Sequence, residues 1–324
     1  MKHYRIPNTD LKVSRLAYGT WHLGGSWDKT PLPDDIKKHA SELIHRAAEL
    51  NINHIDLADI YTFGKSDEAV GYALKQTPGL RDKLVLQAKA GIIIGDNPDF
   101  GQPSRYDFSY DHLVKAVETS LKRLGTDYVD LLALHRPDPL VELDEVARAL
   151  THLEEQGMVR YFGVSNHSAP QIRLLKKTVE VPLVVDQLEL NLLHHYLISA
   201  GMNVNMPGYE TANTLGTLEY CREHDMLVQA WSPVAGGQLF NPAEDAPENV
   251  RKTAALIADY AEAKSTTKEA VALAWLLRHP APIQPILGTQ NLGRLADSVK
   301  ADEVDLSRQE WYSLLAAARG EGVA

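Results

Sequence analysis

The 324-residue chain is 44% hydrophobic and 23% charged, an ordinary composition for a globular protein of one large domain or two smaller ones. Its 33 Lys and Arg residues against 43 Asp and Glu residues give a formal net charge of −10, which argues against nucleic acid and anionic membranes as partners, because polyanions are bound by basic surfaces. No apolar run approaches the roughly 18 residues of a membrane span, and the N-terminus lacks the apolar stretch of a signal peptide, so the sequence predicts a cytoplasmic protein.

The chain begins with a hairpin pattern and continues with eight short apolar runs. The turn residues Pro7, Asn8 and Asp10 separate two apolar runs and predict an N-terminal β-hairpin over residues 4–13. Between the later runs, apolar residues recur at helical spacing, most clearly over 36–48 and 113–124. The eight runs predict strands at Leu16–Thr20, His54–Leu57, Leu84–Ala88, Val129–Leu134, Tyr161–Ser165, Leu183–Gln187, Leu227–Trp231 and Ile283–Leu287.

The alternation of strands and helices predicts the fold class. Parallel strands cannot be joined by a tight turn, so each helix is expected to form a right-handed crossover to the next strand. Eight such units are the number that a (β/α)₈ TIM barrel requires, and we therefore expect one α/β barrel domain over residues 1–324. Helical patterns over 248–262 and 307–318 exceed this count and predict extra C-terminal helices. The main alternative, a doubly wound open sheet, usually carries Gly-x-Gly-x-x-Gly after a strand, a spacing that does not occur here.

Two long segments interrupt the alternation. Residues 91–111 and 192–210 are rich in loop-forming residues and would lie at the carboxyl ends of the strands, where barrel pockets form. We expect Trp21, Tyr106 and Phe108 to line this pocket. The alternative is that Tyr106 and Phe108 only fix the loop to the barrel.

Four polar residues occupy positions where a barrel places catalytic side chains. Asp56, Lys89 and His135 fall at or near the carboxyl ends of predicted strands, and Tyr61 follows in the loop after Asp56. A carboxylate keeps a neighbouring lysine charged, and a charged lysine favours the phenolate of a neighbouring tyrosine, which lowers the pKa of the tyrosine. The tyrosine then becomes a proton donor, and a histidine at the same point orients a carbonyl oxygen. This group suits carbonyl reduction.

Each residue also has a structural interpretation. Asp56 could pair with a lysine or cap a helix, His135 could be a core histidine, and Lys89 could be an inward lysine at a barrel end. Lys89 has a second functional interpretation as a Schiff-base amine. The single cysteine, Cys221, excludes an intramolecular disulfide and a thiolate cluster, and the adjacent histidines at 194–195 would point in different directions, so we expect no metal site.

Several segments resemble the motifs of the aldo-keto reductase superfamily. Any one motif is weak, but six of them in family order between Gly19 and Arg294 are specific. Arg136-Pro137-Asp138 after the histidine, with the long loop after the third strand, is most like a bacterial branch with broad aldehyde and ketone activity. The six motifs are His54–Tyr61, the strand ending in Lys89, Asp130–Asp138, Gly163–Asn166, Asp186–Asn191 and Trp231-Ser232-Pro233, and the collinear match extends from Gly19-Thr20-Trp21 to Arg294.

The resemblance implies roles for the four polar residues. It implies a barrel whose floor is closed by the N-terminal hairpin, and a nicotinamide cofactor bound in extended form without a Rossmann fold. Carried over by motif, Tyr61 is the proton donor, Lys89 lowers its pKa and Asp56 pairs with Lys89. His135 orients the substrate carbonyl, and Trp21, Tyr61 and His135 contact the substrate.

The resemblance also implies a cofactor site. Ser165, Asn166 and Gln187 match the residues that hold the nicotinamide carboxamide, and Trp231 stands where the family places an aromatic ring against the nicotinamide. Backbone amides around 236–237 could approach a pyrophosphate closely, because glycine has no side chain in the way. Further cofactor contacts are expected from Gly19, Thr20, Trp21, Asp56, Ser232, Pro233, Val234, Gly236, Gly237, Gly288, Thr289, Arg294, Asp297 and Ser298.

Two departures from the family pattern affect this carry-over. Leu190 replaces the usual tyrosine before Asn191, and Gly288 stands where many members place a lysine on the 2′-phosphate. Arg294 and Thr289 remain to bind that phosphate, and a planar guanidinium can do so bidentately. The sequence therefore predicts NADP(H) rather than NAD(H).

Two functional hypotheses from different classes follow. The first is an NADPH-dependent enzyme that reduces small-molecule aldehydes or ketones to alcohols. The second is an NADP(H)-binding regulatory or interaction module with negligible turnover, as the channel-associated branch of the superfamily suggests. The intact group of Asp56, Tyr61, Lys89 and His135 favours the first. The sequence indicates neither the physiological substrate nor the oligomeric state.

Overall fold

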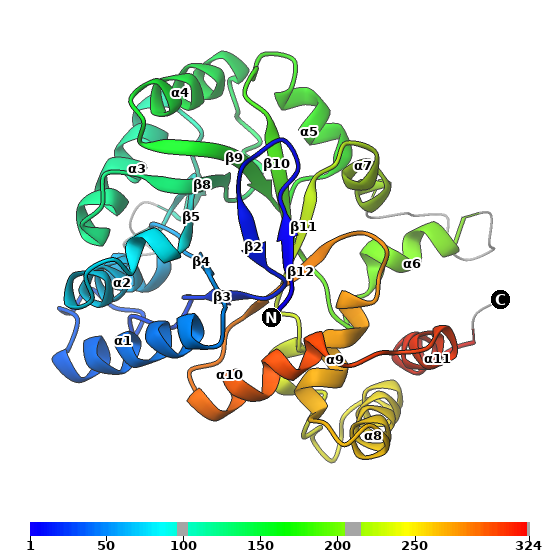
Figure 1. Cartoon of the computed structure of the whole chain (residues 1–324). Coiled ribbons are helices and arrows are strands. Elements are labelled where there is room, and N and C mark those ends of the chain that lie inside the picture. Colours follow the sequence, from blue (N-terminus) through cyan, green and yellow to red (C-terminus); the bar gives the residue numbers. More distant parts are fainter. Residues whose placement is uncertain (96–102, 205–214, 323–324) are drawn as a thin grey trace.

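Eight parallel strands close into a barrel at the centre of the molecule (Figure 1). The computed structural model describes residues 1–95, 103–204 and 215–322. The eight strands pair in chain order from β3 to β12, and β12 returns to pair with β3, so the predicted (β/α)₈ barrel is confirmed. The barrel strands are β3 (Ala17–Gly19), β4 (His54–Asp56), β5 (Val85–Ala90), β8 (Val129–Leu134), β9 (Val159–Ser165), β10 (Leu183–Glu189), β11 (Leu227–Trp231) and β12 (Ile283–Leu287).

Helices surround the barrel (Figure 1), and in the longer ones the buried residues recur at helical spacing. In α3, Ser109 accepts a hydrogen bond from the backbone N–H of His112 at the start, and Gly125 ends the helix with a φ of +67°. The helices are α1 (Asp34–Glu49), α2 (Lys65–Gln76), α3 (Tyr110–Leu124), α4 (Leu143–Glu155), α5 (Ala169–Leu175), α6 (Tyr196–Met202), α7 (Thr217–Glu223), α8 (Glu248–Ala263), α9 (Lys268–Leu277), α10 (Leu292–Ser298) and α11 (Arg308–Arg319), with short 3₁₀ turns η1 (Tyr61–Gly64), η2 (Arg81–Lys83), η3 (Ala235–Gly237) and η4 (Val299–Asp302).

The N-terminal hairpin closes the amino-terminal end of the barrel. Strands β1 (His3–Arg5) and β2 (Lys12–Ser14) pair antiparallel, as predicted. Three apolar side chains of the hairpin are buried against the first residues of the barrel strands, which places a dry floor under the barrel. This apolar floor consists of Ile6, Leu11, Val13, Val85, Leu131, Val184, Val185 and Leu227.

The two extra C-terminal helices are present and brace the barrel from outside. Helices α8 and α11 pack on each other, and α8 also packs on α9. Trp275 of α9 stacks on Trp311 of α11 with ring centroids 5.3 Å apart. Each indole N–H donates to the other residue's carbonyl oxygen, at 3.3 and 2.9 Å, so both buried donors are satisfied.

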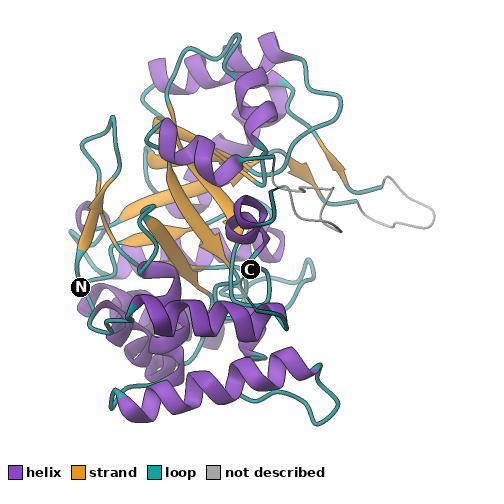
Figure 2. Cartoon of the chain, turned by 90° about the vertical axis from the view of Figure 1, so that its right-hand side faces the viewer, coloured by secondary structure: helices purple, strands orange, loops and turns teal. Residues whose placement is uncertain are grey.

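The long segment after β5 contains more structure than a loop. Strands β6 (Ile92–Ile93) and β7 (Arg105–Tyr106) pair as a short antiparallel ribbon. In Figure 2 this ribbon and the hairpin β1–β2 lie at opposite ends of the barrel. The segment 192–210 carries α6, and its last residues lie outside the described part of the chain. Among the described residues, no helix is long and apolar enough to cross a membrane.

Candidate active site

A buried ion pair lies at the carboxyl end of the barrel. Asp56 ends β4, and Lys89 lies two residues beyond its partner Gln87 on β5. The Lys89 Nζ lies 2.6 Å from Asp56 Oδ1, and the two residues are 1% and 3% exposed. Burial lowers the pKa of Lys89, while the charge and hydrogen bond of Asp56 oppose that change. Two charges are tolerated here because each compensates the other.

Tyr61 is held beside this pair by an unusual turn. The residue begins η1, in which Thr62, Phe63 and Gly64 have φ values of +48°, +59° and +89°. A Cβ on Gly64 would lie 2.2 Å from the Arg123 guanidinium carbon, so position 64 requires glycine for both space and conformation. Arg123 Nη1 also donates to the carbonyl oxygen of Asp59 at 3.0 Å. The turn that presents Tyr61 is therefore fixed from α3.

The predicted catalytic residues come together. The Tyr61 ring centroid lies 4.9 Å from Lys89 Nζ and 5.9 Å from the ring centroid of His135, which follows β8. Tyr61 is 6% and His135 7% exposed. His135 Nδ1 is buried and has no hydrogen-bond partner in the described chain. An ammonium, a phenol and an imidazole thus converge at one barrel end.

The pKa of Tyr61 differs in direction from the expectation. Burial raises it well above its usual value, and the carboxylates of Asp56 and Asp59 raise it further. The charge of Arg136 opposes this increase without cancelling it. Burial and the nearby Lys89 and Arg136 charges lower the pKa of His135 well below its usual value. At neutral pH, Tyr61 therefore keeps its proton and His135 is uncharged.

Polar residues suited to an amide ligand surround the pair. Ser165 Oγ donates to the Gln187 carbonyl oxygen at 2.9 Å, and Asn166 Nδ2 donates to Ser165 Oγ at 2.9 Å. The Trp231 indole N–H donates to Asn166 Oδ1 at 3.0 Å, and Asn166 has a φ of +58°. Gln187 Nε2 donates to Asp56 Oδ1 at 2.8 Å. The predicted carboxamide site and the predicted catalytic pair therefore share hydrogen bonds.

The segment after β11 leaves backbone groups accessible. Ser232, Gly236 and Gly237 all have positive φ values, and a Cβ on either glycine would meet no atom within 4 Å. Pro233 is buried and Val234 half-buried beside them. The Gly237 N–H already donates to the Val234 carbonyl oxygen at 2.9 Å, so the fit to a pyrophosphate depends on the open space beside Gly236 and Gly237. The residues here fit the extended dinucleotide.

The segment after β12 contains both accessible and internally bonded side chains. Arg294 is exposed, Thr289 is half-buried, and a Cβ on Gly288 would meet open space. Asp297 pairs with Lys300 at 2.7 Å in the same segment. The hydroxyl of Ser298 donates to the Arg294 carbonyl oxygen at 2.8 Å. The first three positions fit a cofactor phosphate, whereas the last two side chains already have partners within the chain.

The motif after β3 is part of the same barrel end. A Cβ on Gly19 would lie 2.8 Å from Ile286 Cγ2, so the glycine permits close strand packing. Thr20 Oγ1 donates to the Asp56 carbonyl oxygen at 2.9 Å. Trp21 is 46% exposed, and its ring centroid lies 5.1 Å from that of Tyr61. Trp21 is therefore an accessible wall beside the phenol.

The other two predicted pocket residues behave differently from each other. Tyr106 is 40% exposed on the ribbon β6–β7. Phe108 is 2% exposed and stacks on His167 with ring centroids 6.1 Å apart. A Cβ on Gly91 would lie 2.3 Å from the Phe108 ring. This packing corresponds to the alternative in which Phe108 fixes the loop to the barrel.

The sequence analysis missed two groups near the site. Trp27 is 37% exposed, and its ring centroid lies 4.8 Å from that of Trp21, which extends the aromatic wall. Gln87, Gln229 and Gln284 form a buried hydrogen-bonded chain that leads to Asp56. A glutamine inside each of three short apolar strands is a signal that could have revealed this chain.

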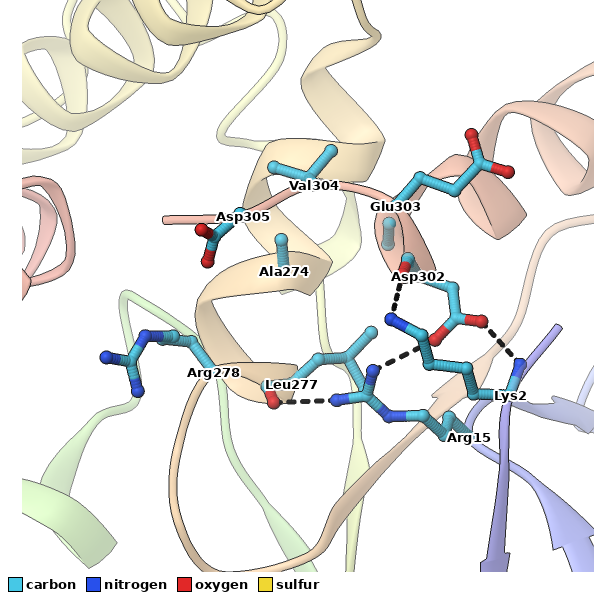
Figure 3. A pocket seen from close by; sticks show the side chains of 10 residues that line it. Lys2, Arg15, Ala274, Leu277, Arg278, Asp302, Glu303, Val304 and Asp305 are labelled. Atoms are coloured by element: carbon cyan, nitrogen blue, oxygen red, sulfur yellow. Dashed lines mark hydrogen bonds and ion pairs between the residues drawn. The ribbon is translucent and has the colours of Figure 1, made fainter. Parts of the chain in front are cut away.

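A polar cavity of about 270 Å³ lies at the other end of the barrel (Figure 3). Arg15 Nη1 pairs with Asp302 Oδ1 at 2.9 Å, and Arg15 Nη2 donates to the Leu277 carbonyl oxygen at 2.8 Å. Lys2 Nζ donates to the Asp302 carbonyl oxygen at 3.0 Å. These contacts connect the hairpin to the segment before α11, so we assign this cavity a structural role.

Comparison with known proteins identifies the family. A model described as the Aldo/keto reductase family matches residues 15–318. The chain belongs to this family. Over 322 residues it is 36% identical to the 6-dehydroglucose reductase of Agrobacterium fabrum, covering 99% of both chains. It is also similar to a putative voltage-gated potassium channel subunit beta of Schizosaccharomyces pombe, at 30% identity over 92% of this chain and 87% of the other. A glycerol dehydrogenase structure from Gluconobacter oxydans superimposes with a TM-score of 0.82 at 26% identity, covering 100% of this chain and 98% of the other.

Family membership makes the chain an oxidoreductase of the aldo/keto reductase type. Members of this family use nicotinamide cofactors and act on small molecules. Within the described residues, no group of three or more His, Cys, Asp or Glu side chains could hold a metal ion. The arrangement of an uncharged imidazole and a protonated phenol beside an ion pair is suited to proton transfer to an oxygen atom.

Proposed function

We propose that the protein is an NADPH-dependent reductase that converts aldehydes and ketones to alcohols, with Tyr61 as the proton donor. The observation that supports this most directly is the convergence of Tyr61, Lys89 and His135 at one barrel end, with Asp56 paired to Lys89 at 2.6 Å. The alternative assignment of Lys89 as a Schiff-base amine is disfavoured by this pair, because an ammonium held by a carboxylate is a poor nucleophile.

Each residue contributes a distinct step. The uncharged His135 imidazole orients the substrate carbonyl by a hydrogen bond, and Tyr61 O–H transfers its proton to the carbonyl oxygen as negative charge develops there. Lys89 stabilises the resulting phenolate through its positive charge, and Asp56 keeps Lys89 charged and in place. The bound cofactor supplies the hydride that adds to the carbonyl carbon. Trp21 lies against the Tyr61 ring, with ring centroids 5.1 Å apart, and could contact the substrate there.

NADP(H) is the cofactor that these residues suit best. Ser165, Asn166 and Gln187 offer both donors and acceptors, which matches a neutral carboxamide. Trp231 offers a flat surface to the nicotinamide ring, which orients its reactive face. Arg294 is exposed at the start of α10, where its guanidinium could pair with a 2′-phosphate.

A hydroxylated aldehyde is the substrate class to test first. The Agrobacterium relative named above and a second relative from Novosphingobium aromaticivorans, 34% identical over 323 residues, are both named 6-dehydroglucose reductase. Trp21 and Trp27 form an exposed aromatic wall 4.8 Å apart beside Tyr61. Such a wall packs against the C–H face of a sugar while solvent-facing hydroxyls remain hydrated.

The test is a coupled measurement of cofactor and product. The protein is mixed with NADPH and a panel containing a sugar 6-aldehyde, an aliphatic aldehyde, an electron-poor aromatic aldehyde and a ketone. We expect loss of nicotinamide absorbance and formation of one alcohol per NADPH for at least one compound. NADPH oxidation without alcohol formation, or no oxidation across the panel, would contradict the proposal.

The alternative is an NADP(H)-binding interaction module with negligible turnover. The similarity to a putative potassium channel subunit beta supports this second hypothesis. A module of this kind would bind NADPH tightly, would release a product slowly or not at all, and would retain a protein partner in a pull-down. Rapid multiple turnover under excess aldehyde argues against this alternative.

A further inference from the structure

Four glutamine side chains form a continuous chain inside the barrel, where branched apolar side chains usually predominate. Gln87, Gln187, Gln229 and Gln284 come from strands β5, β10, β11 and β12, and each is at most 2% exposed. Gln284 Nε2 donates to the carbonyl oxygen of Ser14 at 2.7 Å. The chain therefore reaches from the hairpin at the barrel floor toward the opposite end.

Gln229 is the junction of this chain. Its Oε1 accepts from Gln87 Nε2 at 2.7 Å and from Gln187 Nε2 at 3.3 Å. Its Nε2 donates to Gln87 Oε1 at 2.9 Å and to Gln284 Oε1 at 3.0 Å. Both polar atoms of this buried amide therefore bind two partners each, which fixes the side chain in one orientation.

Asp56 determines the direction of the chain. Its Oδ1 accepts from Lys89 Nζ at 2.6 Å, from Gln187 Nε2 at 2.8 Å and from Gln87 Nε2 at 3.2 Å. An ionised carboxylate only accepts hydrogen bonds, so both amides must turn their NH₂ groups toward it. Each NH₂ group has two hydrogens, and the second hydrogen of each goes to Gln229 Oε1.

We propose that Gln229 is a positioning residue that holds the amides of Gln87 and Gln187 in the orientation in which both donate to Asp56. Among the described residues, no donor reaches Gln187 Oε1. This fixed amide therefore presents an acceptor to the carboxamide NH₂ of a nicotinamide. The inference rests on the proposed function, because the orientation serves a bound cofactor next to the Asp56–Lys89 pair.

Loss of the junction would free both neighbouring amides. Without Gln229 Oε1, the second hydrogen of each NH₂ group lacks its acceptor, and the Gln187 amide is held by Asp56 alone. The amide could then rotate and present a donor where the cofactor needs an acceptor. A small displacement of groups at a reacting centre lowers the rate strongly.

The experiment compares Gln229→Met with Gln284→Met. Methionine is close to glutamine in length and makes no comparable hydrogen bond. Both positions are fully buried in the same chain, but among the described residues Gln284 makes no hydrogen bond to Asp56, Gln87 or Gln187. We measure the melting temperature, the Kd of NADPH by quenching of tryptophan fluorescence, and kcat with an aldehyde that the wild type reduces.

We expect both variants to lose melting temperature to a similar extent. In Gln229→Met, the Kd of NADPH should rise and kcat should fall by about tenfold each, whereas Gln284→Met should stay within about twofold of the wild type. Equal changes in Kd and kcat for the two variants would overturn the proposal, as would wild-type values in Gln229→Met. If Gln229→Met does not fold, Gln87→Met replaces it: a weaker change in the same direction supports the proposal, and none overturns it.

The NADPH Kd, measured by tryptophan fluorescence, tests this inference separately from the proposed function. A wild type that binds NADPH but reduces no aldehyde would contradict the proposed reductase activity. The ratio of NADPH Kd values between Gln229→Met and Gln284→Met would still decide whether Gln229 positions Gln187. A ratio near one would then overturn the inference on its own.

Discussion

The two ends of the barrel are built from the same strands and differ in almost every physical property. Strand β5 makes the contrast within five residues: Val85 belongs to the apolar floor, Gln87 to the buried amide chain and Lys89 to the ion pair. The hairpin closes the amino-terminal end with apolar side chains. The carboxyl end holds the buried Asp56–Lys89 pair, the turn of positive φ at Tyr61–Gly64, and a His135 Nδ1 that has no partner among the described residues.

This difference separates stability from chemistry along each strand. The apolar side chains of the floor gain free energy of folding from their buried area. Buried polar atoms without a partner in the described chain occur at both ends, in His54 at the start of β4 and in His135 after β8. What distinguishes the carboxyl end is that it brings the Asp56–Lys89 ion pair, Tyr61 and His135 together, a grouping that is retained where function requires it. A substitution at one end should therefore change activity, and a substitution at the other should change stability.

The largest expected effect belongs to Tyr61→Phe at the carboxyl end. Removal of the hydroxyl removes the proton donor, and general acid catalysis is typically worth about 10²–10⁴ in rate, so kcat should fall by that factor. The melting temperature should change by little, because the ring and its contacts with Trp21 and His135 remain. The measurement is kcat under saturating NADPH and aldehyde, with Tyr106→Phe on the exposed ribbon as control. A Tyr61→Phe enzyme as fast as the wild type would make the assignment of the proton donor wrong.

Leu131→Ala tests the opposite end. Leu131 is fully buried in the apolar floor, and truncation of a buried leucine typically costs about 2–5 kcal/mol of unfolding free energy. We expect that loss in a denaturant titration together with an unchanged kcat per folded molecule. Leu140→Ala, at a position 86% exposed, serves as the control with little effect on either quantity. A large loss of kcat in folded Leu131→Ala would contradict the separation of the two ends.

The fold was predictable because the spacing of apolar residues along the sequence indicates which faces of the strands and helices are buried. Each barrel strand is a short run buried on both faces, and the helices keep one apolar stripe, so the number and order of elements followed from the sequence. The ribbon β6–β7 was missed because each of its strands has only two residues and packs little apolar surface. Phe108 was ambiguous because an aromatic residue in a loop has the same sequence pattern whether it lines a pocket or fixes the loop.

The sequence predicted which residues form the site but not the direction of the Tyr61 pKa shift. Asp56, Lys89 and His135 were identifiable from their positions at strand ends. The upward shift of the Tyr61 pKa depends on burial and on the charges of Asp56 and Asp59, and the burial of a loop residue is set by the tertiary structure rather than by its motif. The hydrogen bonds of Gln229 join strands far apart in sequence, and only the closed barrel brings those residues into contact.

The pH dependence of the melting temperature tests a second buried group at the carboxyl end, the carboxyl of Asp67. Burial raises the pKa of Asp67 in α2 from 3.8 to about 7, so the folded protein retains a proton that the unfolded chain has released. This contribution to stability is complete below the unfolded pKa and is lost as the pH rises through about 7. The melting temperature of the wild type should fall from pH 5 to pH 8, and Asp67→Asn, uncharged throughout, should reduce that slope.

The neighbouring residue provides the control for this titration. Glu68 is exposed on the same helix, so Glu68→Gln should retain most of the wild-type slope. Ser120 donates to Asp67 Oδ2 at 2.8 Å, a bond that an asparagine oxygen can also accept, so the substitution preserves the local packing. An identical slope in wild type and Asp67→Asn would show that Asp67 is not the titrating group.

The smallest expected effect concerns Arg294, which lies at the same end of the barrel but outside its buried part. A guanidinium that binds a phosphate forms a charge-assisted hydrogen bond, which contributes about 1.5–3 kcal/mol at most to binding. Because Arg294 is exposed, solvent weakens this bond. We therefore expect Arg294→Met to raise the KM for NADPH by about tenfold. The KM for NADH should stay nearly constant, because NADH has no 2′-phosphate, and kcat should not change. Lys300→Met in the adjacent turn is the matched control, since its ammonium is already paired with Asp297. Equal increases in both KM values would assign Arg294 to the adenine or to the fold of α10, and the preference for NADP(H) would then need another source.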